Sequence, residues 1–361
     1  MIINKLELCD FRNYQISQFE FDDNTNILYG DNAQGKTNVL EAIFLAGTTK
    51  SHKNSKDNEM VRVEASEAHI RMSMTKADIH HKIDVHLKKH GSKGIAIDGV
   101  TVKKSSEVMG LCNIIVFSPE DLNIIKNGPS ERRRFINMEL SQIDKMYLHY
   151  LTKYNKVLNQ RNNLLKQISF DSKLLDTLDI WDMQLVENGI EIMKARDEFI
   201  RKLNEMMKGI HHRLSGGKED ILVEYEPNVA TDYFSEKLFL ARDKDLYQGT
   251  TSVGPHRDDI RFQIDDKDIR KYGSQGQQRT TALSLKLSEI EIVKEVVGET
   301  PVLLLDDVLS ELDRKRQNYL LESIKGIQTI ITCTGLEEFI ENKVNISRTF
   351  EIENGTIKKL V

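Results

Sequence analysis

Residues Gly30 to Asn38 read GDNAQGKTN, a loop of the pattern G-x-x-x-x-G-K-T between a short apolar run and a helix-like segment, residues 39–44. Glycine permits backbone conformations that a β-carbon hinders, so successive N–H groups can turn inward around an anion. The positive end of the next helix points to the same place. Lys36 supplies a cation for the outer phosphates, and the Thr37 hydroxyl supplies a Mg²⁺ ligand. The stretch therefore predicts a P-loop for a nucleoside triphosphate rather than a glycine-containing surface turn.

The composition of the whole chain narrows the class of protein. The 361 residues carry a net charge of −5 and are 39% hydrophobic and 30% charged, which is typical of a globular protein large enough for two domains. A negative net charge requires any nucleic-acid contact to come from a local basic face. No apolar run is long enough to span a membrane, and the N-terminus resembles no secretory leader. Cys9, Cys112 and Cys333 lack metal-ligand spacing, so we predict reduced thiols and a cytoplasmic protein.

The first 110 residues or so show the period-two hydrophobic alternation of β-strands, interrupted by the P-loop helix. Asp98-Gly99 is typical of a hairpin turn in this β meander. We expect the histidines of the meander on the solvent-exposed face of a half-buried sheet, with a metal-binding cluster as the alternative. These histidines are His80, His81, His86 and His90.

Residues 129–212 contain little glycine or proline, and their apolar side chains recur at three- and four-residue steps. This periodicity predicts two long helices packed as a hairpin, or a small helical lobe. Strand-like runs return after it, and Asn354-Gly355 predicts a C-terminal hairpin. We therefore expect an ATPase core made from both chain ends, residues 1–118 and 218–361, with residues 119–217 inserted as a helical lobe.

A buried strand that ends in two carboxylates is predicted at Val302–Asp307, VLLLDD. The carboxyl ends of such strands are where ligands bind in open α/β sheets. Asp306 would hold Mg²⁺ directly or through water, and Asp307 could polarise the attacking water. A strand followed by an ordinary acidic turn is the alternative, which the P-loop in the same chain disfavours.

Two further segments resemble motifs of ABC-type ATPases. GSQGQQR, residues 273–279, opens a predicted helix one element before the VLLLDD strand and resembles the signature motif. A serine and a glycine at a helix start offer a hydroxyl and N–H groups to a phosphate, although a polar N-capped helix alone has the same pattern. SELD, Ser310–Asp313, resembles the D-loop.

The motifs in chain order resemble the RecF family of bacterial recombination mediators, in the SMC/Rad50-like branch of ABC ATPases. They are FRNY (Phe11–Tyr14), GDNAQGKTN, FSPEDL (Phe117–Leu122), GPSERRRF (Gly128–Phe135), GPHRDD (Gly254–Asp259), GSQGQQR and LLLDDVLSELD. The resemblance covers essentially the whole chain. It implies an α/β fold of the ABC-type ATPase head, with a P-loop core sheet, an antiparallel β meander and an inserted α-helical lobe.

The resemblance also implies a function. It indicates a cytoplasmic, ATP-dependent DNA-binding protein of recombinational repair, replication restart and the SOS response to DNA damage. ATP and Mg²⁺ are the implied cofactors, and slow, DNA-stimulated ATP hydrolysis is the implied switch. ATP-driven homodimers are expected on gapped or junction DNA, on single- and double-stranded regions. There they would help RecO and RecR to load RecA where single-strand-binding protein blocks it.

The motifs assign candidate residues to these roles. Catalysis is expected from Asp307 and Lys36, and metal binding from Thr37 and Asp306. Nucleotide binding is expected from Arg12, Asn13, Gly30, Asp31, Asn32, Ala33, Gln34, Gly35, Lys36, Thr37 and Asn38. The signature, acting on the nucleotide of the partner subunit, comprises Ser274, Gln275, Gly276 and Gln277, and the D-loop contributes Ser310 and Asp313. DNA contacts are expected from Lys53, Arg132, Arg133 and Arg134, with an ordinary charged surface as the alternative.

The chain departs from the broader ABC pattern at three places. Asp307 stands where most ABC ATPases have glutamate, which is consistent with slow turnover. Ser118 occupies the apparent Q-loop glutamine position, and Thr332-Cys333-Thr334 replaces the switch histidine. The γ-phosphate sensors therefore stay unassigned. GPHRDD offers possible metal ligands, but no others lie nearby in sequence, so we expect a tight turn into a strand.

Three other classes of protein share some of these features. The ATPase subunit of an ABC transporter has the P-loop, signature and D-loop, but the missing Q-loop glutamine, the missing switch histidine and the large helical insertion argue against it. A DNA-end tether of the Rad50 type needs long coiled-coil arms, which the central segment is too short and irregular to form. A GTPase is disfavoured because no N-K-x-D guanine motif is present.

Overall fold

Val302–Asp306 forms strand β12, and all of its residues are buried, as expected for a strand covered on both faces of its sheet. The structure is a computed structural model that describes residues 1–168, 170–336 and 346–360. β12 lies between β8 (Ile114–Phe117) and β13 (Thr329–Cys333) and runs parallel to both. Beyond β13 lies β3 (Thr25–Tyr29), which is parallel to β13 and leads into the glycine-rich loop. The carboxyl ends of β3 and β12 therefore meet at one edge of the sheet.

A hairpin completes this six-stranded sheet, whose order is β15-β14-β3-β13-β12-β8. β14 (Ile346–Glu353) is parallel to β3 and turns into antiparallel β15 (Thr356–Leu360). Asn354 and Gly355 in the turn have φ values of 48° and 71°, the left-handed conformations that an Asn-Gly hairpin turn requires. The predicted C-terminal hairpin is confirmed.

The predicted β meander forms a second six-stranded sheet, which is antiparallel and has the order β2-β1-β4-β5-β6-β7. Its strands are β1 (Ile2–Phe11), β2 (Tyr14–Glu20), β4 (Glu67–Lys76), β5 (Ile79–Lys88), β6 (Gly94–Ile97) and β7 (Val100–Thr101). The predicted turn at Asp98-Gly99 joins the last two. Helix α1 (Lys36–Thr48) is buried on nearly every side because it packs against strands of both sheets.

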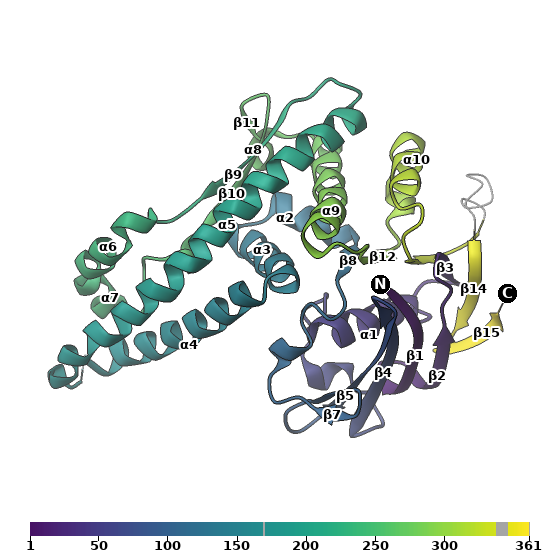
Figure 1. Ribbon diagram of the computed structural model, residues 1–361, viewed down its shortest axis with the longest axis horizontal. Helices are drawn as coiled ribbons and strands as arrows, with labels where there is room; N and C mark the ends of the chain where they lie inside the picture. Colours follow the sequence, from purple (N-terminus) through teal and green to yellow (C-terminus); the bar gives the residue numbers. More distant parts are fainter. Residues whose placement is uncertain (169, 337–345, 361) are drawn as a thin grey trace. The chain divides into compact units, whose positions relative to one another are not determined.

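The chain divides into two compact units (Figure 1). Unit 1 comprises Met1–Asp121 and Glu289–Val361, and it contains both six-stranded sheets, α1 and α10 (Arg314–Ser323). Unit 2 comprises Leu122–Ser288. Its helices are α2 (Leu122–Lys126), α3 (Pro129–Ile143), α4 (Lys145–Ile168), α5 (Leu178–Ser215), α6 (Phe234–Leu240), α7 (Arg242–Gln248), α8 (Ile269–Tyr272) and the first part of α9 (Gln275–Val297).

The predicted helical hairpin of unit 2 consists of α4 and α5, which pack along each other (Figure 1). A buried arginine links the two helices to each other and to α7. Arg161 on α4 donates to Asp182 on α5 at 2.5 Å and to Asp245 on α7 at 2.7 Å. Against α5 lies a separate three-stranded sheet of order β11-β10-β9. Its strands are β9 (Ile221–Glu226), β10 (Asp259–Ile264) and β11 (Lys267–Asp268).

The division of the chain differs from the expected one at its second boundary. Unit 2 starts at Leu122, close to the expected residue 119, but it continues to Ser288 instead of ending at residue 217. The physical reason is the pairing of strands β9–β11, which form a sheet of their own and pack on α5 rather than joining the core sheets. Unit 2 is consequently a mixed α/β unit and not purely helical.

Two simpler expectations concern membranes and cysteines. Among the helices of the described residues, none combines the length and the apolarity that a membrane span requires. Cys9, Cys112 and Cys333 are all free thiols, as predicted, and burial raises the pKa of the Cys112 thiol to about 12.

Candidate nucleotide-binding site

The glycine-rich loop leads from β3 into the first turn of α1. Gly30 has a φ of 145°, and a β-carbon there would lie 2.4 Å from the carbonyl oxygen of Ile352. Gly35, with a φ of 114°, is the N-cap of α1, and a β-carbon there would collide with the Asn13 side chain. Neither a side-chain cap nor an acidic residue neutralises the first turn of α1. The Asn38 N–H donates to the Gly35 carbonyl oxygen at 3.0 Å. The N–H groups of Lys36 and Thr37 before it, together with the positive end of the helix dipole, point to where an anion would bind.

Lys36, the first residue of α1, folds back over this loop. Its ammonium nitrogen donates to the carbonyl oxygens of Gly30 at 2.6 Å and Asp31 at 2.7 Å. Burial lowers the pKa of Lys36, an effect opposed by the negative charges of nearby Asp306 and Asp307. The residues between, Asn32, Ala33 and Gln34, complete the loop, and Asn38 lies in the first turn of the helix.

Thr37 and Asp306 come together across the sheet edge. The Thr37 hydroxyl donates to Asp306 Oδ1 at 2.7 Å, joining α1 to the end of β12. A hydroxyl and a carboxylate are hard oxygen donors, the kind that Mg²⁺ prefers, so these two residues fit the predicted metal-binding role. The same oxygen of Asp306 also accepts from Thr332 on β13 at 2.8 Å.

Asp307 is exposed and has a φ of 53°, a left-handed backbone uncommon for a residue with a side chain. The backbone N–H and the carbonyl group of Asp307 are both hydrogen-bonded. Its N–H donates to Thr332 Oγ1 at 3.1 Å, and its carbonyl oxygen accepts from the Ser310 hydroxyl at 2.8 Å. The sequence reasoning noted Thr332 only as part of the segment that replaces a histidine. The structure shows it bound to both aspartates.

Arg12 and Asn13 lie in the turn between β1 and β2, beside the loop. Arg12 donates twice to Glu41, each time at 2.8 Å, and Glu41 is fully buried on α1. Arg12 and the Ser51 hydroxyl hold the pKa of Glu41 below its ordinary value against the opposing effect of burial. Glu41 was missed from the sequence, although a lone carboxylate inside the apolar run VLEAIF is a signal of a buried ion pair.

Asn13 supports the loop through its side-chain amide. It donates to the Gln34 carbonyl oxygen and accepts from the Asn38 amide, both at 2.9 Å. The Tyr14 hydroxyl donates to the Gly35 carbonyl oxygen at 3.1 Å. The turn after β1 therefore fixes the shape of the glycine-rich loop.

The signature and D-loop residues lie at two other helix starts. Ser274 caps α9 in unit 2: its hydroxyl accepts from Gln277 N–H at 3.2 Å, and its own N–H donates to the Gln277 side chain at 2.9 Å. Gln275 and Gly276 follow it and are exposed. In unit 1, Asp313 caps α10 by accepting from Arg316 N–H at 3.0 Å.

The prediction that the basic run of α3 contacts DNA is wrong for one of its three arginines. Arg132 is 2% exposed and is bound by Asp259 at 2.6 and 3.0 Å and by two carbonyl oxygens, so it cannot reach DNA phosphate. Helical spacing could have shown this, because Arg132 lies on the same helix face as buried Phe135. Arg133 and Arg134 are half-buried, and Lys53 is exposed.

GPHRDD forms the predicted turn into a strand, β10. Its two aspartate side chains accept hydrogen bonds from arginines of unit 2. Asp258 accepts from Arg196 at 2.8 Å, and Asp259 from Arg132. His256 is hydrogen-bonded to the Tyr154 hydroxyl at 2.6 Å and to the Thr251 carbonyl oxygen at 3.0 Å. The segment is therefore the predicted tight turn, fixed by contacts within unit 2.

A P-loop helix beside a parallel strand that ends in carboxylates, joined to an antiparallel sheet, defines the class of protein as an ATPase head of the ABC type. The profile described as RecF/RecN/SMC N terminal domain matches residues 2–358. The chain belongs to this family, and within it to the RecF proteins, which match it over its full length at up to 59% identity.

Similarity to known proteins extends over the full length. The DNA replication and repair protein RecF of Lachnoclostridium phytofermentans is 59% identical over 359 residues, 99% of this chain and 100% of that protein. The protein of the same name from Agathobacter rectalis is 57% identical over 358 residues, 99% of each chain. A solved structure, of the recombination mediator protein RecF-ATP in the RecFOR pathway, has a TM-score of 0.93 at 38% identity, covering 100% of this chain and 98% of that chain.

Proposed function

We propose that the chain binds ATP and Mg²⁺ at the P-loop and uses them as a switch for binding DNA in replication and repair. The observation that carries the proposal is the hydrogen bond of 2.7 Å between Thr37 and Asp306. It places two oxygen donors suited to Mg²⁺ at the uncapped start of α1. The similarity to a RecF-ATP structure supports ATP as the nucleotide. Lys36 would exchange its carbonyl contacts for the outer phosphates.

Hydrolysis is proposed to be slow and to be stimulated by DNA. Mg²⁺, when bound, would neutralise charge on the phosphates. Asp307 would orient the attacking water, and its side chain is one methylene shorter than the glutamate of most ABC ATPases. The water would consequently be held less closely, which limits turnover and suits a switch.

ATP is proposed to drive dimerisation. The signature residues Ser274 to Gln277 begin a helix, and Ser274 is exposed, so its hydroxyl and the N–H groups near it can meet a phosphate held by another subunit. Ser310 and Asp313 would lie at the same subunit boundary. The proposed substrate is gapped or junction DNA. RecO and RecR are the proposed partners, and RecA and single-strand-binding protein take part indirectly, in the cytoplasm.

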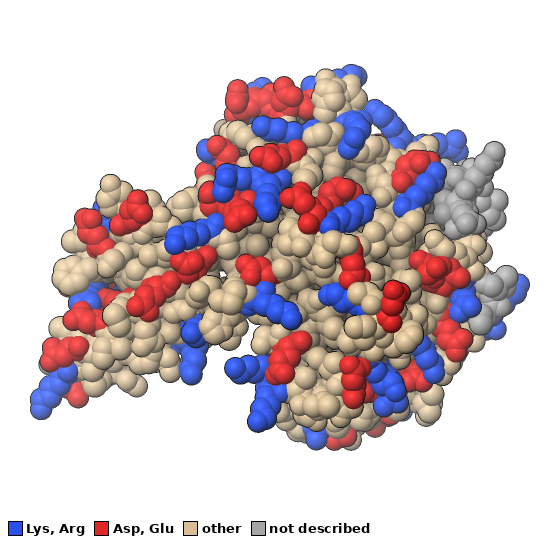
Figure 2. Space-filling model, in the orientation of Figure 1, with Lys and Arg blue, Asp and Glu red and all other residues tan. Residues whose placement is uncertain are grey.

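DNA contacts are proposed for Lys53, Arg133 and Arg134. On the face that Figure 2 shows, Lys and Arg are interspersed with Asp and Glu. A few local phosphate contacts fit this distribution better than a broad basic surface does. The role of transporter subunit is not favoured, because the similarity to RecF proteins spans the whole chain.

Light scattering on the full chain tests the switch. We expect a dimer with ATP and Mg²⁺, a monomer with ADP or no nucleotide, and stronger dimerisation with gapped duplex DNA. Asp307→Asn should bind ATP like the parent, hydrolyse it at least tenfold more slowly, an estimate of roughly 1.4 kcal/mol in barrier, and stay dimeric on DNA. A monomer under all conditions, or parental hydrolysis by Asp307→Asn, would contradict the proposal.

A further inference from the structure

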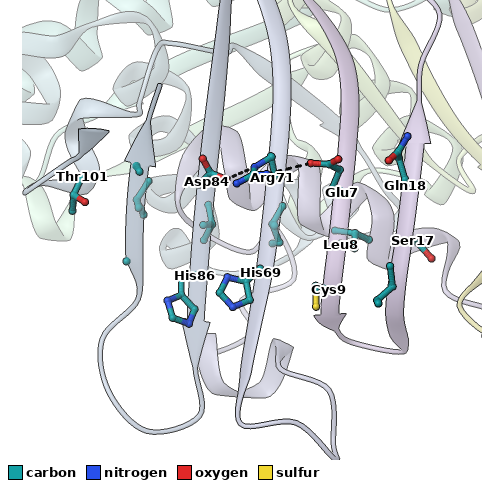
Figure 3. Close-up of a pocket in the computed structure, with 16 residues that line it drawn as sticks. Glu7, Leu8, Cys9, Ser17, Gln18, His69, Arg71, Asp84, His86 and Thr101 are labelled. Atoms are coloured by element: carbon teal, nitrogen blue, oxygen red, sulfur yellow. Dashed lines mark hydrogen bonds and ion pairs between the residues drawn. The ribbon is translucent and has the colours of Figure 1, made fainter. Parts of the chain in front are cut away.

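The outward face of the antiparallel sheet in unit 1 carries a row of side chains with metal-binding chemistry (Figure 3). Cys9, His69 and His86 lie directly opposite one another on β1, β4 and β5. Their chain neighbours Leu8, Ile70 and Val85 are buried on the other face. Because side chains alternate along a strand, the row of three is turned to solvent.

Two imidazoles and one carboxylate in this region are grouped closely. The rings of His69 and His86 stack with centroids 4.2 Å apart and planes inclined by 16°. Glu67, two residues before His69 on β4, places a carboxylate oxygen 2.7 Å from His86 Nε2. One ligand atom from each of the three lies within 4.8 Å of the other two. We call these residues the Glu67–His69–His86 cluster.

The other polar side chains nearby are engaged elsewhere. In the adjacent row, Arg71 pairs with Asp84 at 2.6 Å and approaches Glu7 at 3.8 Å. On the same strand as His86, His80 is hydrogen-bonded to Thr75 and His81 to Asp98, each at 2.9 Å. Lys88 also lies near the cluster, with its ammonium nitrogen 3.7 Å from Glu67 and its side chain exposed. The sequence analysis favoured an exposed face for His86 and three other histidines and gave a metal-binding cluster of these four as the alternative. In the structure, His69 rather than those three lies beside His86.

We propose that the Glu67–His69–His86 cluster binds one divalent transition-metal ion of the zinc class. Neutral imidazole is the form of histidine that binds metal. Zinc binds imidazole nitrogen and carboxylate oxygen at about 2.0–2.2 Å in a tetrahedral arrangement, so two ligand atoms on one ion lie roughly 3.3–3.6 Å apart. The ligand atoms of the three side chains lie within 4.8 Å of one another, and rotation of the side chains would bring them to this spacing.

The surroundings leave space for the remaining ligands of the ion. The cluster borders a hollow of about 550 Å³ on the sheet face, lined also by Gly94 and Ala96, which are small. Water can therefore complete the coordination. An ion held there would join β4 to β5 through their side chains, and it would stabilise unit 1 because only the folded sheet assembles the three ligands.

Isothermal titration calorimetry with zinc chloride tests the proposal on the full chain. Excess Mg²⁺ is present throughout, because it would occupy oxygen-donor sites such as that of Thr37 and Asp306 but competes poorly for imidazole. We expect one zinc ion per chain for the parent. His69→Ala and Glu67→Gln should each weaken zinc binding at least about tenfold. His80→Ala removes an imidazole from the same strand as His86 and is the matched control, with unchanged affinity expected.

A second measurement does not depend on heats of binding. Zinc should raise the Tm of the parent and of His80→Ala but not that of a His69→Ala, His86→Ala double variant. Circular dichroism of the double variant, whose changes are at the surface, checks that it is folded. Equal zinc affinity in the parent and His69→Ala, or a loss in His80→Ala as large as in His69→Ala, would overturn the proposal.

Discussion

At the scale of single residues, the hydroxyl of Thr332 links the two consecutive aspartates of the nucleotide site. It donates to Asp306 and accepts from the N–H of Asp307. Asp306 is expected to bind metal and Asp307 to orient water, and this hydroxyl joins the carboxylate of the first to the backbone N–H of the second. It also helps to hold the uncommon backbone conformation of Asp307, which would relax without it.

Thr332→Val is a test of this role, because valine has nearly the same shape and lacks the hydroxyl. We expect ATP binding within about threefold of the parent and hydrolysis slower by roughly tenfold, equivalent to about 1.4 kcal/mol in the barrier. Thr332→Ser keeps the hydroxyl and should hydrolyse ATP close to the parental rate. Steady-state phosphate release distinguishes them, and equal rates in the valine and serine variants would show that the hydroxyl has no such role.

At the scale of elements, α3 shows why consecutive basic residues in a sequence do not define a DNA-binding surface. Arg132 faces the interior and binds Asp259 of β10, whereas Arg134 is partly exposed with Glu131 at 3.8 Å. Removing one partner of a buried ion pair leaves the other uncompensated. An exposed pair contributes little.

Arg132→Met should therefore destabilise unit 2 by about 3–5 kcal/mol, and Arg134→Met by less than about 1 kcal/mol. Trp181, the single tryptophan of the chain, lies on α5 in unit 2, so its fluorescence in urea reports this unit. For DNA binding, the larger effect is expected from Arg134→Met instead. This variant should reduce the salt dependence of DNA binding by about one phosphate contact. Equal stability losses in the two variants would contradict the assignment.

The turn between Gly254 and β10 predicts a dependence of stability on pH. The Thr251 carbonyl oxygen can only accept, so His256 Nε2 donates to it, and in the neutral ring Nδ1 then accepts from the Tyr154 hydroxyl. Burial lowers the pKa of His256 from 6.5 to about 4. The unfolded chain therefore takes up the proton first as pH falls. The stabilisation is complete above pH 6.5 and is lost between that value and about 4.

The expected loss between pH 7 and pH 4 is on the order of 3 kcal/mol. His256→Gln, which can still donate to Thr251 and accept from Tyr154, should lack this contribution while other groups titrate as before. Urea unfolding followed by Trp181 fluorescence at several pH values compares the two. If the free energy of unfolding changed with pH in the same way in parent and variant, His256 would not titrate as argued.

The same elements show what the sequence could predict. The P-loop, the VLLLDD strand and both hairpin turns depend on local patterns, and the structure has them where they were expected. The roles of Thr332 and Glu41 were not predicted, because their partners lie 26 and 29 residues away in the chain and meet them only in the folded protein. Strands β9–β11 were assigned to the core because alternation identifies a strand but not the sheet it joins.

At the scale of the whole molecule, the proposed function requires two chains. Lys36 belongs to unit 1 and Ser274 to unit 2, and each ATP is proposed to lie between Lys36 of one subunit and Ser274 of the other. Ser274→Arg should allow ATP binding and block closure, because a large cation would occupy the place of the γ-phosphate. Lys36→Ala should weaken ATP binding at the opposite side of the same site. Each variant alone should be nearly inactive.

Mixing the two variants tests whether the sites are shared. In a mixed two-fold dimer, one site carries both changes and the other carries neither. Random mixing makes about half of the dimers mixed, so about a quarter of all sites are intact. ATPase activity should therefore reappear, at up to about a quarter of the parental level, if the sites work independently.

The control places both changes in one chain and mixes it with the parent. Every mixed dimer then has two sites with one change each, so activity should fall below simple dilution of the parent. The two mixtures contain the same substitutions and differ only in which chain carries them, so folding defects cannot produce opposite departures. If both mixtures follow the average of their components, Ser274 does not act on the nucleotide of another subunit, and the proposed dimer lacks shared sites.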